Sequence, residues 1–323
     1  MSQKAPGKSN REGVTFMQLA DMFPTDDDAR EWFEAKIWPD GRECPRCNSR
    51  RTCEASHKKM PYWCSDCRSY FSVKTGSVME GSPLPLRKWV YAIYMHLTSL
   101  KGVSSMKLHR DIGVTQKTAW FMLQRIRKAF ERNDDEPPFS GPVEIDETYF
   151  GGKRKNKSNA ERKQAEGRGP VDMTAVVGAK DRPTKKVTAK VIASTDKATL
   201  QGFVADSASP DAQVFTDDAT AYEGIANPHE AVKHSVSEFV AGMAHTNGIE
   251  SFWAMLKRAH KGIYHKMSPK HLARYVTEFA GRHNIRESGT LAQMASLAAG
   301  MRGKRLTYRD LIAPNGLSSS ARS

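Results

Sequence analysis

The sequence contains few cysteines and no long apolar run. No stretch of its 323 residues approaches the roughly 20 consecutive apolar residues of a membrane span, and Met1 to Arg30 has no apolar signal-peptide core. Five cysteines are too few and too clustered for a disulfide framework. These absences argue against a membrane protein and a disulfide-rich secreted protein, and we expect the chain to stay in the cytoplasm.

Acidic residues are outnumbered by basic ones. Fifty Lys and Arg stand against 36 Asp and Glu, which gives a formal net charge of +14. This charge suits a polyanionic partner, because neutralising phosphates releases condensed counterions. A merely soluble basic protein has the same composition, so charge alone does not separate the two classes. With 39% hydrophobic residues, the chain can build two or three domains with cores of their own.

Four of the five cysteines form two pairs with the spacing of a metal site. Sixteen residues separate Cys44-Pro-Arg-Cys47 from Cys64-Ser-Asp-Cys67, and two such knuckles offer four thiolates to a tetrahedral Zn²⁺. A redox pair is the alternative, but redox Cys-x-x-Cys pairs do not usually come doubled at this spacing. We predict a structural zinc ribbon, with Cys53 left as a free thiol.

The segment after the cysteines has the spacing of a helix-turn-helix. Ser104 begins one helix, and Asp111-Ile-Gly-Val-Thr115 forms a turn that leads into the next. In a DNA-binding protein, Gln116 and Lys117 would then enter a major groove, followed along the same basic helix by Arg125, Arg127 and Lys128. An ordinary three-helix bundle with a solvated basic face has the same pattern.

An acidic, proline-rich linker separates these helices from a series of strand-like runs. These runs are Val143–Phe150, Val171–Gly178, Val187–Ala193 and Gln213–Thr216. Together with a helix at Lys197 to Ala205, they predict a mixed α/β domain. Between Gly151 and Gly169 the sequence is rich in Lys and Arg. We predict a mobile basic loop there, which could hold DNA.

Two carboxylates stand on or at the ends of these strands. Asp146 lies in Val143-Glu-Ile-Asp-Glu-Thr-Tyr-Phe150, and Asp217 ends the run Val214-Phe-Thr. Alternation along the strand places Asp146 on a sheet face, but spacing does not exclude Glu144 or Glu147 as competitors. Asp218 is a rival of Asp217, although its side chain should point the opposite way.

A third carboxylate, Glu250, lies on a segment with helical periodicity. The helix should bury one apolar stripe, formed by Ile249, Phe252, Trp253 and Leu256. Glu250 and Lys257 lie two turns apart on a neighbouring face, which pairs an acid that can reach a metal with a cation that can neutralise a DNA phosphate. A catalytic zinc is an alternative that the usual ligand spacing does not support, with candidate ligands near this helix at His245, His260 and His265.

Together these motifs resemble one family, the bacterial insertion-sequence transposases with an N-terminal zinc ribbon and a DDE-type, ribonuclease H-like catalytic domain. The resemblance covers roughly Asp26 to Arg286. It rests on the two cysteine pairs, Ile145-Asp-Glu-Thr-Tyr-Phe-Gly-Gly152, Thr216-Asp217 with Tyr222, and His245-Thr-Asn-Gly-Ile-Glu-Ser-Phe-Trp-Ala-Met-Leu-Lys-Arg258. It implies that Asp146, Asp217 and Glu250 are the catalytic triad. Asp218 stands where a glycine is expected, and Asn247 is a lesser candidate because some relatives use Asn as the third acid.

The resemblance implies an α/β fold: a ribonuclease H-like mixed sheet with flanking helices, preceded by a small zinc ribbon and a helical, helix-turn-helix-like region. The expected domains are an N-terminal tail and helix (1–40), the zinc ribbon (41–80), the helical DNA-binding region (81–133), a linker (134–142), the catalytic domain (143–286) and a C-terminal tail (287–323).

The implied function is a transposase that binds the ends of its insertion sequence, then cuts and joins DNA with Mg²⁺ or Mn²⁺. Two such ions about 4 Å apart would stabilise the attacking and leaving oxygens of a phosphodiester displacement. The expected partners are double-stranded DNA, as terminal inverted repeats and as target, and further copies of the chain in a homodimer or higher oligomer. DNA contacts are expected from Gln116, Lys117, Arg125, Lys257 and Arg258.

Two other functions fit the same sequence features. A ribonuclease H-like nuclease would hydrolyse DNA without joining it to a second molecule. A DNA-binding regulator with an inactive catalytic domain would use the zinc ribbon and helix-turn-helix alone and would show no Mg²⁺-dependent cutting. The intact set of three carboxylates favours the transposase.

Overall fold

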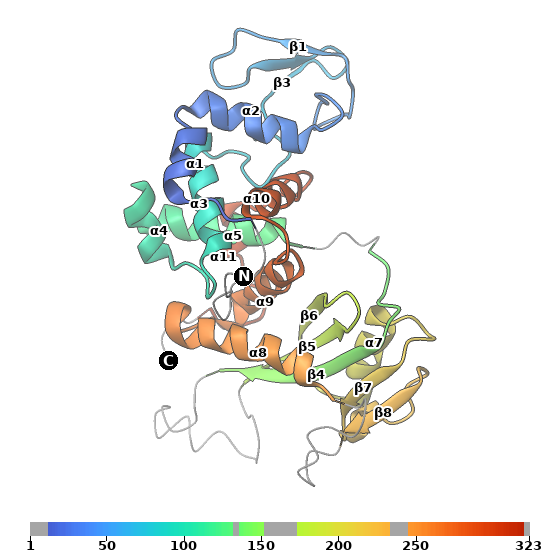
Figure 1. The fold of residues 1–323 in the computed structure, drawn as a ribbon. Helices are drawn as coiled ribbons and strands as arrows, with labels where there is room; N and C mark the ends of the chain where they lie inside the picture. The colour runs from blue at the N-terminus through green and yellow to red at the C-terminus, as the bar shows by residue number, and fades with distance from the viewer. Residues whose placement is uncertain (1–11, 132–135, 152–172, 233–244, 320–323) are drawn as a thin grey trace, which may run out of the picture. The chain divides into compact units, whose positions relative to one another are not determined.

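The structure is a computed structural model that describes residues 12–131, 136–151, 173–232 and 245–319. The chain forms two compact units (Figure 1). Unit 1 comprises Met1–Glu131 and Ile285–Ala313, and unit 2 comprises Arg132–Asn284 and Pro314–Ser323. Each unit contains its own hydrophobic core.

Unit 1 combines a small antiparallel sheet with short helices. The sheet has the strand order β1-β2-β3, and its strands are β1 (Thr52–Glu54), β2 (Tyr62–Cys64) and β3 (Ser69–Phe71). The helices are α1 (Phe16–Met22), α2 (Asp26–Ile37), α3 (Leu86–Thr98), α4 (Ser105–Ile112), α5 (Gln116–Ala129), α10 (Thr290–Ala299) and α11 (Tyr308–Ile312).

Local sequence signals explain where these helices begin. Thr25 caps α2 through a reciprocal capping box with Asp28, and two further acidic residues complement the helix dipole in the first turn. Ser104 and Thr115 cap α4 and α5 with their side chains, as the sequence predicts. Gly113 ends α4 with a φ of 61°, a left-handed conformation that glycine adopts without steric cost. The predicted helix, turn and helix are therefore present.

One continuous core joins the cysteine-rich segment, the helices and the C-terminal segment within unit 1. Phe71 of β3, Trp89 of α3 and Leu297 of α10 belong to the same buried cluster. Helix α10 packs against α2 and α3, although the sequence suggests only a tail over 287–323. Burial of apolar residues such as Met294 stabilises this segment as a helix. Because the helix depends on packing partners that are distant in the sequence, no local motif predicts it.

Unit 2 is a five-stranded mixed sheet with helices on both faces. Its strands are β4 (Val143–Phe150), β5 (Thr174–Asp181), β6 (Val187–Ile192), β7 (Val214–Asp217) and β8 (His229–Val232). Its helices are α7 (Lys197–Ser207), α8 (Asn247–Ala259) and α9 (Pro269–Asn284), with a 3₁₀ turn at η2 (Thr220–Tyr222) and a π-helical turn at η4 (His260–Tyr264). This arrangement confirms the mixed α/β class.

The sheet has the strand order β6-β5-β4-β7-β8. Strands β4, β5 and β6 pair antiparallel, whereas β4 with β7 and β7 with β8 pair parallel. Asp146 pairs with Gly178 of β5, and on the other side Glu144 pairs with Phe215 of β7. Continuing that register by two residues sets Asp217, the last residue of β7, beside Asp146.

The two faces of this sheet are covered by different helices (Figure 1). Helix α7 packs on the face that contains Ile145 and Val177, whereas α8 and α9 pack on the opposite face, which contains Phe150 and Val176. Even-numbered residues of β4 therefore point toward α8, and odd-numbered residues point toward α7.

A glycine allows α8 to lie close to the sheet. A Cβ on Gly178 would stand 2.7 Å from the ring of Trp253 in α8, a distance that real side-chain contacts do not tolerate. The four residues of the predicted apolar stripe on α8, Ile249, Phe252, Trp253 and Leu256, are all buried. Because Gly178 pairs with Asp146, the place where α8 meets the sheet is also the place where the carboxylates lie.

Candidate functional site

Three carboxylates cluster beside the end of β7. Asp146, Glu147 and Asp217 each offer a carboxylate oxygen, and these oxygens lie within 4.8 Å of one another. All three side chains are half-buried. The sequence predicts that Asp146 and Asp217 meet, and the strand register brings them together. Glu147 belongs to the same cluster, although strand alternation alone would point it away from Asp146.

The structure separates Asp217 from its rival Asp218. Asp217 belongs to the carboxylate cluster, and its Oδ1 accepts a hydrogen bond from the backbone N–H of Ala219 at 3.2 Å. Asp218 is exposed and outside the cluster. The alternation argument from the sequence therefore selects the residue that faces Asp146.

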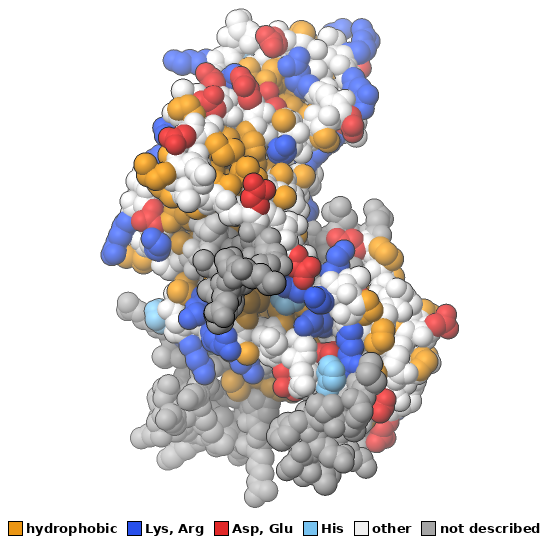
Figure 2. Space-filling model, viewed as in Figure 1, with side chains coloured by type: hydrophobic (Ala, Val, Ile, Leu, Met, Phe, Trp, Pro, Cys, Tyr) orange, Lys and Arg blue, Asp and Glu red, His pale blue; other side chains and the backbone are white. Residues whose placement is uncertain are grey.

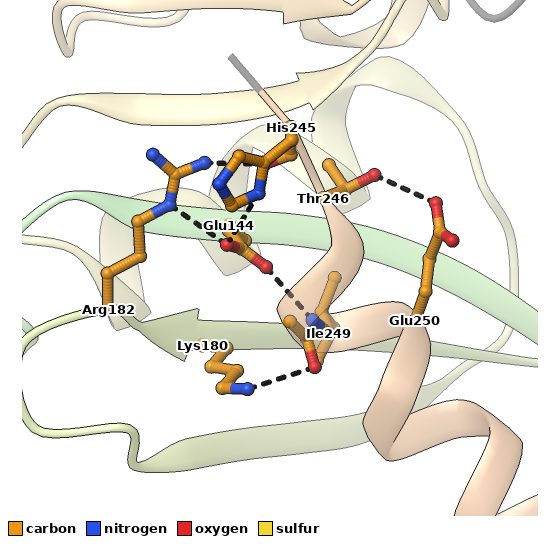
Figure 3. Close-up of polar contacts among 8 residues, drawn as sticks. Glu144, Lys180, Arg182, His245, Thr246, Ile249 and Glu250 are labelled. Atoms are coloured by element: carbon orange, nitrogen blue, oxygen red, sulfur yellow. Dashed lines mark hydrogen bonds and ion pairs between the residues drawn. The ribbon is translucent and has the colours of Figure 1, made fainter. Parts of the chain in front are cut away.

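Glu250 lies in the first turn of α8, outside the tight cluster. Its side chain is exposed, and its Oε1 accepts a hydrogen bond from Thr246 Oγ1 at 3.1 Å (Figure 3). Its negative charge nevertheless contributes to raising the pKa of Asp146. Glu250 thus lies within electrostatic range of Asp146 but outside the group of three carboxylates whose oxygens lie together.

The cluster is electrostatically unfavourable without a cation. Burial, followed by repulsion from Asp217, raises the pKa of Asp146 to about 6. Burial and the charges of Asp217 and Asp146 raise the pKa of Glu147 to about 8. Desolvation and like charges both disfavour the ionised carboxylate. A divalent cation would remove this penalty, and carboxylate oxygens are the ligands that Mg²⁺ and Mn²⁺ prefer.

The other competitor on β4, Glu144, has a different role. It is 2% exposed and lies on the α8 side of the sheet. Its carboxylate accepts hydrogen bonds from Arg182 Nε and from the backbone N–H of Ile249, both at 2.9 Å. These partners leave Glu144 occupied at the start of α8, away from the cluster of Asp146, Glu147 and Asp217.

The alternative of a histidine-bound metal is not supported. In the parts of the chain that the structure describes, two groups of three or more candidate ligands come together, the four cysteines and the three carboxylates, and neither includes a histidine. His245 Nδ1 instead lies 3.3 Å from Glu144 Oε1. The ring of His260 packs edge-on against Phe150, and burial lowers the pKa of this histidine.

The four predicted cysteines form one compact cluster in unit 1. Their sulfur atoms lie within 4.8 Å of one another, with Cys44 3.6 Å from Cys67 and Cys47 3.6 Å from Cys64. Four thiolates around a tetrahedral Zn²⁺, each about 2.3 Å from the metal, stand about 3.8 Å apart. The cluster therefore fits a structural zinc. Cys53 is exposed and outside it.

The four cysteines have unequal surroundings: burial raises the pKa of the Cys44 thiol, burial and the neighbouring sulfurs raise that of Cys47, and the pKa of Cys64 is lowered. Backbone N–H groups of Cys67 and Asp66 point at the Cys64 sulfur and lower the pKa of this thiol to about 7. Thiolates are the form that binds metals. Beside the cluster, Tyr62 packs edge-on against Trp38, and its hydroxyl donates to Glu34 Oε1 of α2 at 2.6 Å. Strand β2, which carries Cys64, is thus joined to α2 through Tyr62.

The predicted DNA-contacting residues of α5 divide into exposed and buried ones. Gln116 and Lys117 are exposed at the start of the helix. Gln116 Nε2 donates to Ser105 Oγ of α4 at 2.8 Å, and the Lys117 ammonium lies 4.8 Å from the centre of the Tyr308 ring. Both side chains can turn toward a ligand at the surface.

The sequence predicts that Arg125, further along the same basic helix, contacts DNA, but this side chain is buried. Its side chain is 8% exposed, its guanidinium stacks on Phe121, and Nε donates to the Leu306 carbonyl at 3.1 Å. Arg127 is also buried, at 1% exposure. The C-terminal segment covers this face of α5, which the sequence of α5 by itself does not indicate.

The basic residues of α8 are exposed as predicted. Lys257 and Arg258 lie in its last turn, and Figure 2 shows Lys and Arg side chains gathered over that end of the helix. The predicted basic loop Lys153 to Arg168 lies outside the described residues. In the described parts of the chain, no helix combines the length and apolar character that crossing a bilayer requires.

Some residues of this region are not recognisable from sequence. Arg182 follows β5 in a Pro- and Lys-containing turn, and only the fold shows that its guanidinium meets Glu144 and stacks 4.0 Å above the Phe215 ring. Glu147 could be found only as an acid adjacent to Asp146. The pairing of β4 with β7 ends at Glu144 and Phe215. Beyond that point the long side chain of Glu147 reaches the carboxylate cluster.

Two family models match the segments that contain the cysteine cluster and the carboxylate cluster. Residues 138–284 match the ISXO2-like transposase domain, and residues 24–69 match the transposase zinc-ribbon domain. Over 264 residues the chain is 29% identical to an uncharacterized protein in transposable element ISH50 of Halobacterium salinarum, and this alignment covers 77% of the chain and 87% of that relative. The two domain matches together cover more than half of the chain. The protein therefore belongs to the insertion-sequence transposases that carry an N-terminal zinc ribbon and a DDE-family transposase domain.

Proposed function

We propose that the protein is a transposase that binds the ends of its insertion sequence and catalyses DNA cleavage and strand transfer at Asp146, Asp217 and Glu250. The observation that carries this proposal is the carboxylate cluster on the sheet of unit 2, with Glu250 on the helix that covers the same face. The mixed sheet, antiparallel from β6 to β4 and parallel through β7 and β8, supports a ribonuclease H-like domain.

The residues present suit Mg²⁺ or Mn²⁺. The ligands of such an ion would be the carboxylates of Asp146, Asp217 and Glu250. Glu147 adds a buried Oε1 that has no hydrogen-bond partner among the residues that the structure describes. Two bound ions would activate the attacking hydroxyl or water and stabilise the leaving oxygen of the phosphodiester. Strands β4 and β7 hold two of the acids on a rigid sheet, and such preorganisation favours the transition state.

Charged and polar groups on both units are proposed to hold DNA. Lys257 and Arg258 at the end of α8 would neutralise phosphates near the carboxylates. In unit 1, Gln116 and Lys117 open α5 after a tight turn, the position from which a recognition helix reads base edges. DNA binding by both units would explain why the chain has a net charge of +14. Copies of the chain are expected to assemble on the two ends of one element.

The test compares Asp217→Asn with its matched control Asp218→Asn. The substrate is end-labelled duplex DNA from the region that flanks the coding sequence, searched first for inverted repeats bracketed by a short direct duplication. We expect Asp217→Asn to lower Mg²⁺-dependent cleavage and strand transfer about 10³-fold, because the loss of a metal ligand removes roughly 4 kcal/mol of transition-state stabilisation. Binding to the terminal repeat should stay nearly intact.

The control and the products separate the alternatives. Asp218→Asn should remain within about threefold of the wild-type rate, since its side chain is exposed outside the cluster. Full strand transfer by Asp217→Asn would refute the assignment of the site. Cleavage without joining to a second DNA would identify a nuclease, and binding without any Mg²⁺-dependent cutting would identify a regulator.

A further inference from the structure

A buried carboxylate from the sheet reaches the N-terminus of the helix that carries Glu250. Glu144 points from β4 toward the start of α8 (Figure 3). One of its oxygens, Oε2, accepts the backbone N–H of Ile249 at 2.9 Å, and the other, Oε1, accepts Arg182 Nε at the same distance. Fully buried acids are rare unless their charge is paired. Here the guanidinium of Arg182 pairs the charge of Glu144.

Helix α8 lacks the usual cap of its own. The residue at its N-cap position, Thr246, makes no side-chain capping hydrogen bond to the helix backbone. The first backbone N–H groups of a helix need acceptors from elsewhere, and a negative charge there also complements the helix dipole. Glu144 supplies both from a different element. The hydroxyl of Thr246 is thereby left to donate to Glu250 Oε1 at 3.1 Å.

Further contacts fix the segment that leads into α8. Arg182 Nη2 donates to the His245 carbonyl at 2.6 Å, and Lys180 Nζ donates to the Gly248 carbonyl at 3.0 Å. A Cβ on Gly248 would stand 2.5 Å from Glu144 Oε2 and 2.9 Å from Lys180 Nζ. Glycine is therefore the residue that lets the helix start approach the Glu144 carboxylate.

We propose that Glu144 is a positioning residue that sets where Glu250 stands relative to Asp146. Glu144 and Asp146 lie two residues apart on the same face of β4, and Ile249, which Glu144 holds, directly precedes Glu250. One strand thus carries both a metal ligand and the anchor for the helix that carries the third acid. This inference rests on the proposed function in that Glu250 is taken as a ligand of the catalytic metal.

The contact between Glu144 and Ile249 is broken in two ways, by Glu144→Ala and by Gly248→Ala. The second variant keeps the carboxylate and its pairing with Arg182, so it remains informative if Glu144→Ala does not fold. Glu144→Gln separates the two contacts, because its amide oxygen can still accept the N–H of Ile249, whereas its amide nitrogen cannot accept from Arg182 Nε. Glu230→Ala is the control, since it removes an exposed carboxylate from the same sheet.

Three measurements on the full chain follow these variants. Hydrogen exchange compares the exchange rates of the amides in the first turn of α8 with those in α9. Calorimetric titration with Mn²⁺ measures metal affinity in the absence of DNA. Strand transfer is measured as a function of Mg²⁺ concentration. We expect about tenfold faster exchange in the first turn for Glu144→Ala and Gly248→Ala, with α9 unchanged. Mn²⁺ affinity should fall, and the Mg²⁺ concentration for half-maximal strand transfer should rise, about 10- to 100-fold, as for other residues that orient metal ligands.

The conservative variant separates positioning from general stability. Glu144→Gln should restore first-turn exchange and metal affinity to within about threefold of wild type, and Glu230→Ala should match wild type. The inference is overturned if Gly248→Ala, and Glu144→Ala where it folds, leave exchange and metal affinity within twofold of wild type. If the wild type joins no DNA, the proposed function fails, while exchange and Mn²⁺ affinity still decide the role of Glu144.

Discussion

The two ligand clusters of this protein are built in opposite ways. The four cysteines come from one short segment, and two of them, Cys44 and Cys64, are buried in the core of unit 1. The carboxylates come from β4, β7 and α8, elements that are distant in the sequence, and burial together with repulsion among the acids raises the pKa of Asp146 and Glu147. A closed set of four thiolates stabilises a fold, whereas an open, mutually repelling set of acids remains ready for ions and substrate.

The largest effect should come from breaking the cysteine cluster. Cys64→Ser removes one of the four ligands, and structural zinc supplies about 10–16 kcal/mol in small zinc-dependent peptides. We expect loss of bound zinc and rapid proteolysis within 41–80, as measured by elemental analysis and limited digestion. Cys53→Ser is the matched control, because Cys53 is exposed outside the cluster. Retention of zinc by Cys64→Ser would show that the cluster is not a four-cysteine site.

A smaller effect should appear in the carboxylate cluster as pH changes. The pKa values of Asp146 and Glu147 are raised from 3.8 and 4.5 to about 6 and about 8. The folded protein therefore holds protons that the unfolded chain has lost, so the free energy of unfolding of unit 2 falls as pH rises between the unfolded and folded pKa values. Without added Mg²⁺, its melting temperature should drop by at least about 5 °C between about pH 6 and pH 8.5.

Mg²⁺ and a charge-removing variant should each reduce this drop. Bound Mg²⁺ compensates the ionised acids, and Asp217→Asn removes one of the repelling charges. Asp218→Asn should melt as the wild type does at every pH, because its carboxylate lies outside the cluster. An unchanged melting temperature over this range in the wild type would mean that the acids are already compensated.

The smallest effect should come from a single cation at the surface. Lys257→Ala should weaken DNA binding about threefold and reduce the salt dependence of log K by about one, because one phosphate contact is lost. Lys190→Ala, an exposed lysine on β6, is the control and should bind as the wild type does. Equal affinities for both variants over a salt titration would remove Lys257 from the proposed DNA contacts.

Much of the fold was accessible from local patterns. The helix start at Ser104, the turn at Gly113 and the apolar stripe of α8 are all present as predicted, because each depends on residues within a turn or two. The prediction of strand Val171–Gly178 was displaced, since β5 spans Thr174–Asp181. Strand β8 and helices α9, α10 and α11 had no prediction, because their formation depends on packing partners elsewhere in the chain.

The candidate site shows the same division. From the sequence, the family resemblance pairs Asp146 with Asp217, and strand alternation favours Asp217 over Asp218, but Glu144 and Glu147 remain competitors of Asp146. The fold distinguishes them, because Arg182 and the start of α8 occupy Glu144, whereas Glu147 reaches the cluster. Arg125 was misjudged for the corresponding reason, since the carbonyl that it binds belongs to Leu306.

The sequence by itself determined the four-cysteine motif, the family resemblance and the helix that carries Glu250, since these depend on spacing within short segments. Only the tertiary structure decided which acids meet, which arginine is buried and which carboxylate holds the start of α8. Strand register and helix packing join residues that are far apart in the chain, and such contacts depend on many weak interactions that no local motif encodes.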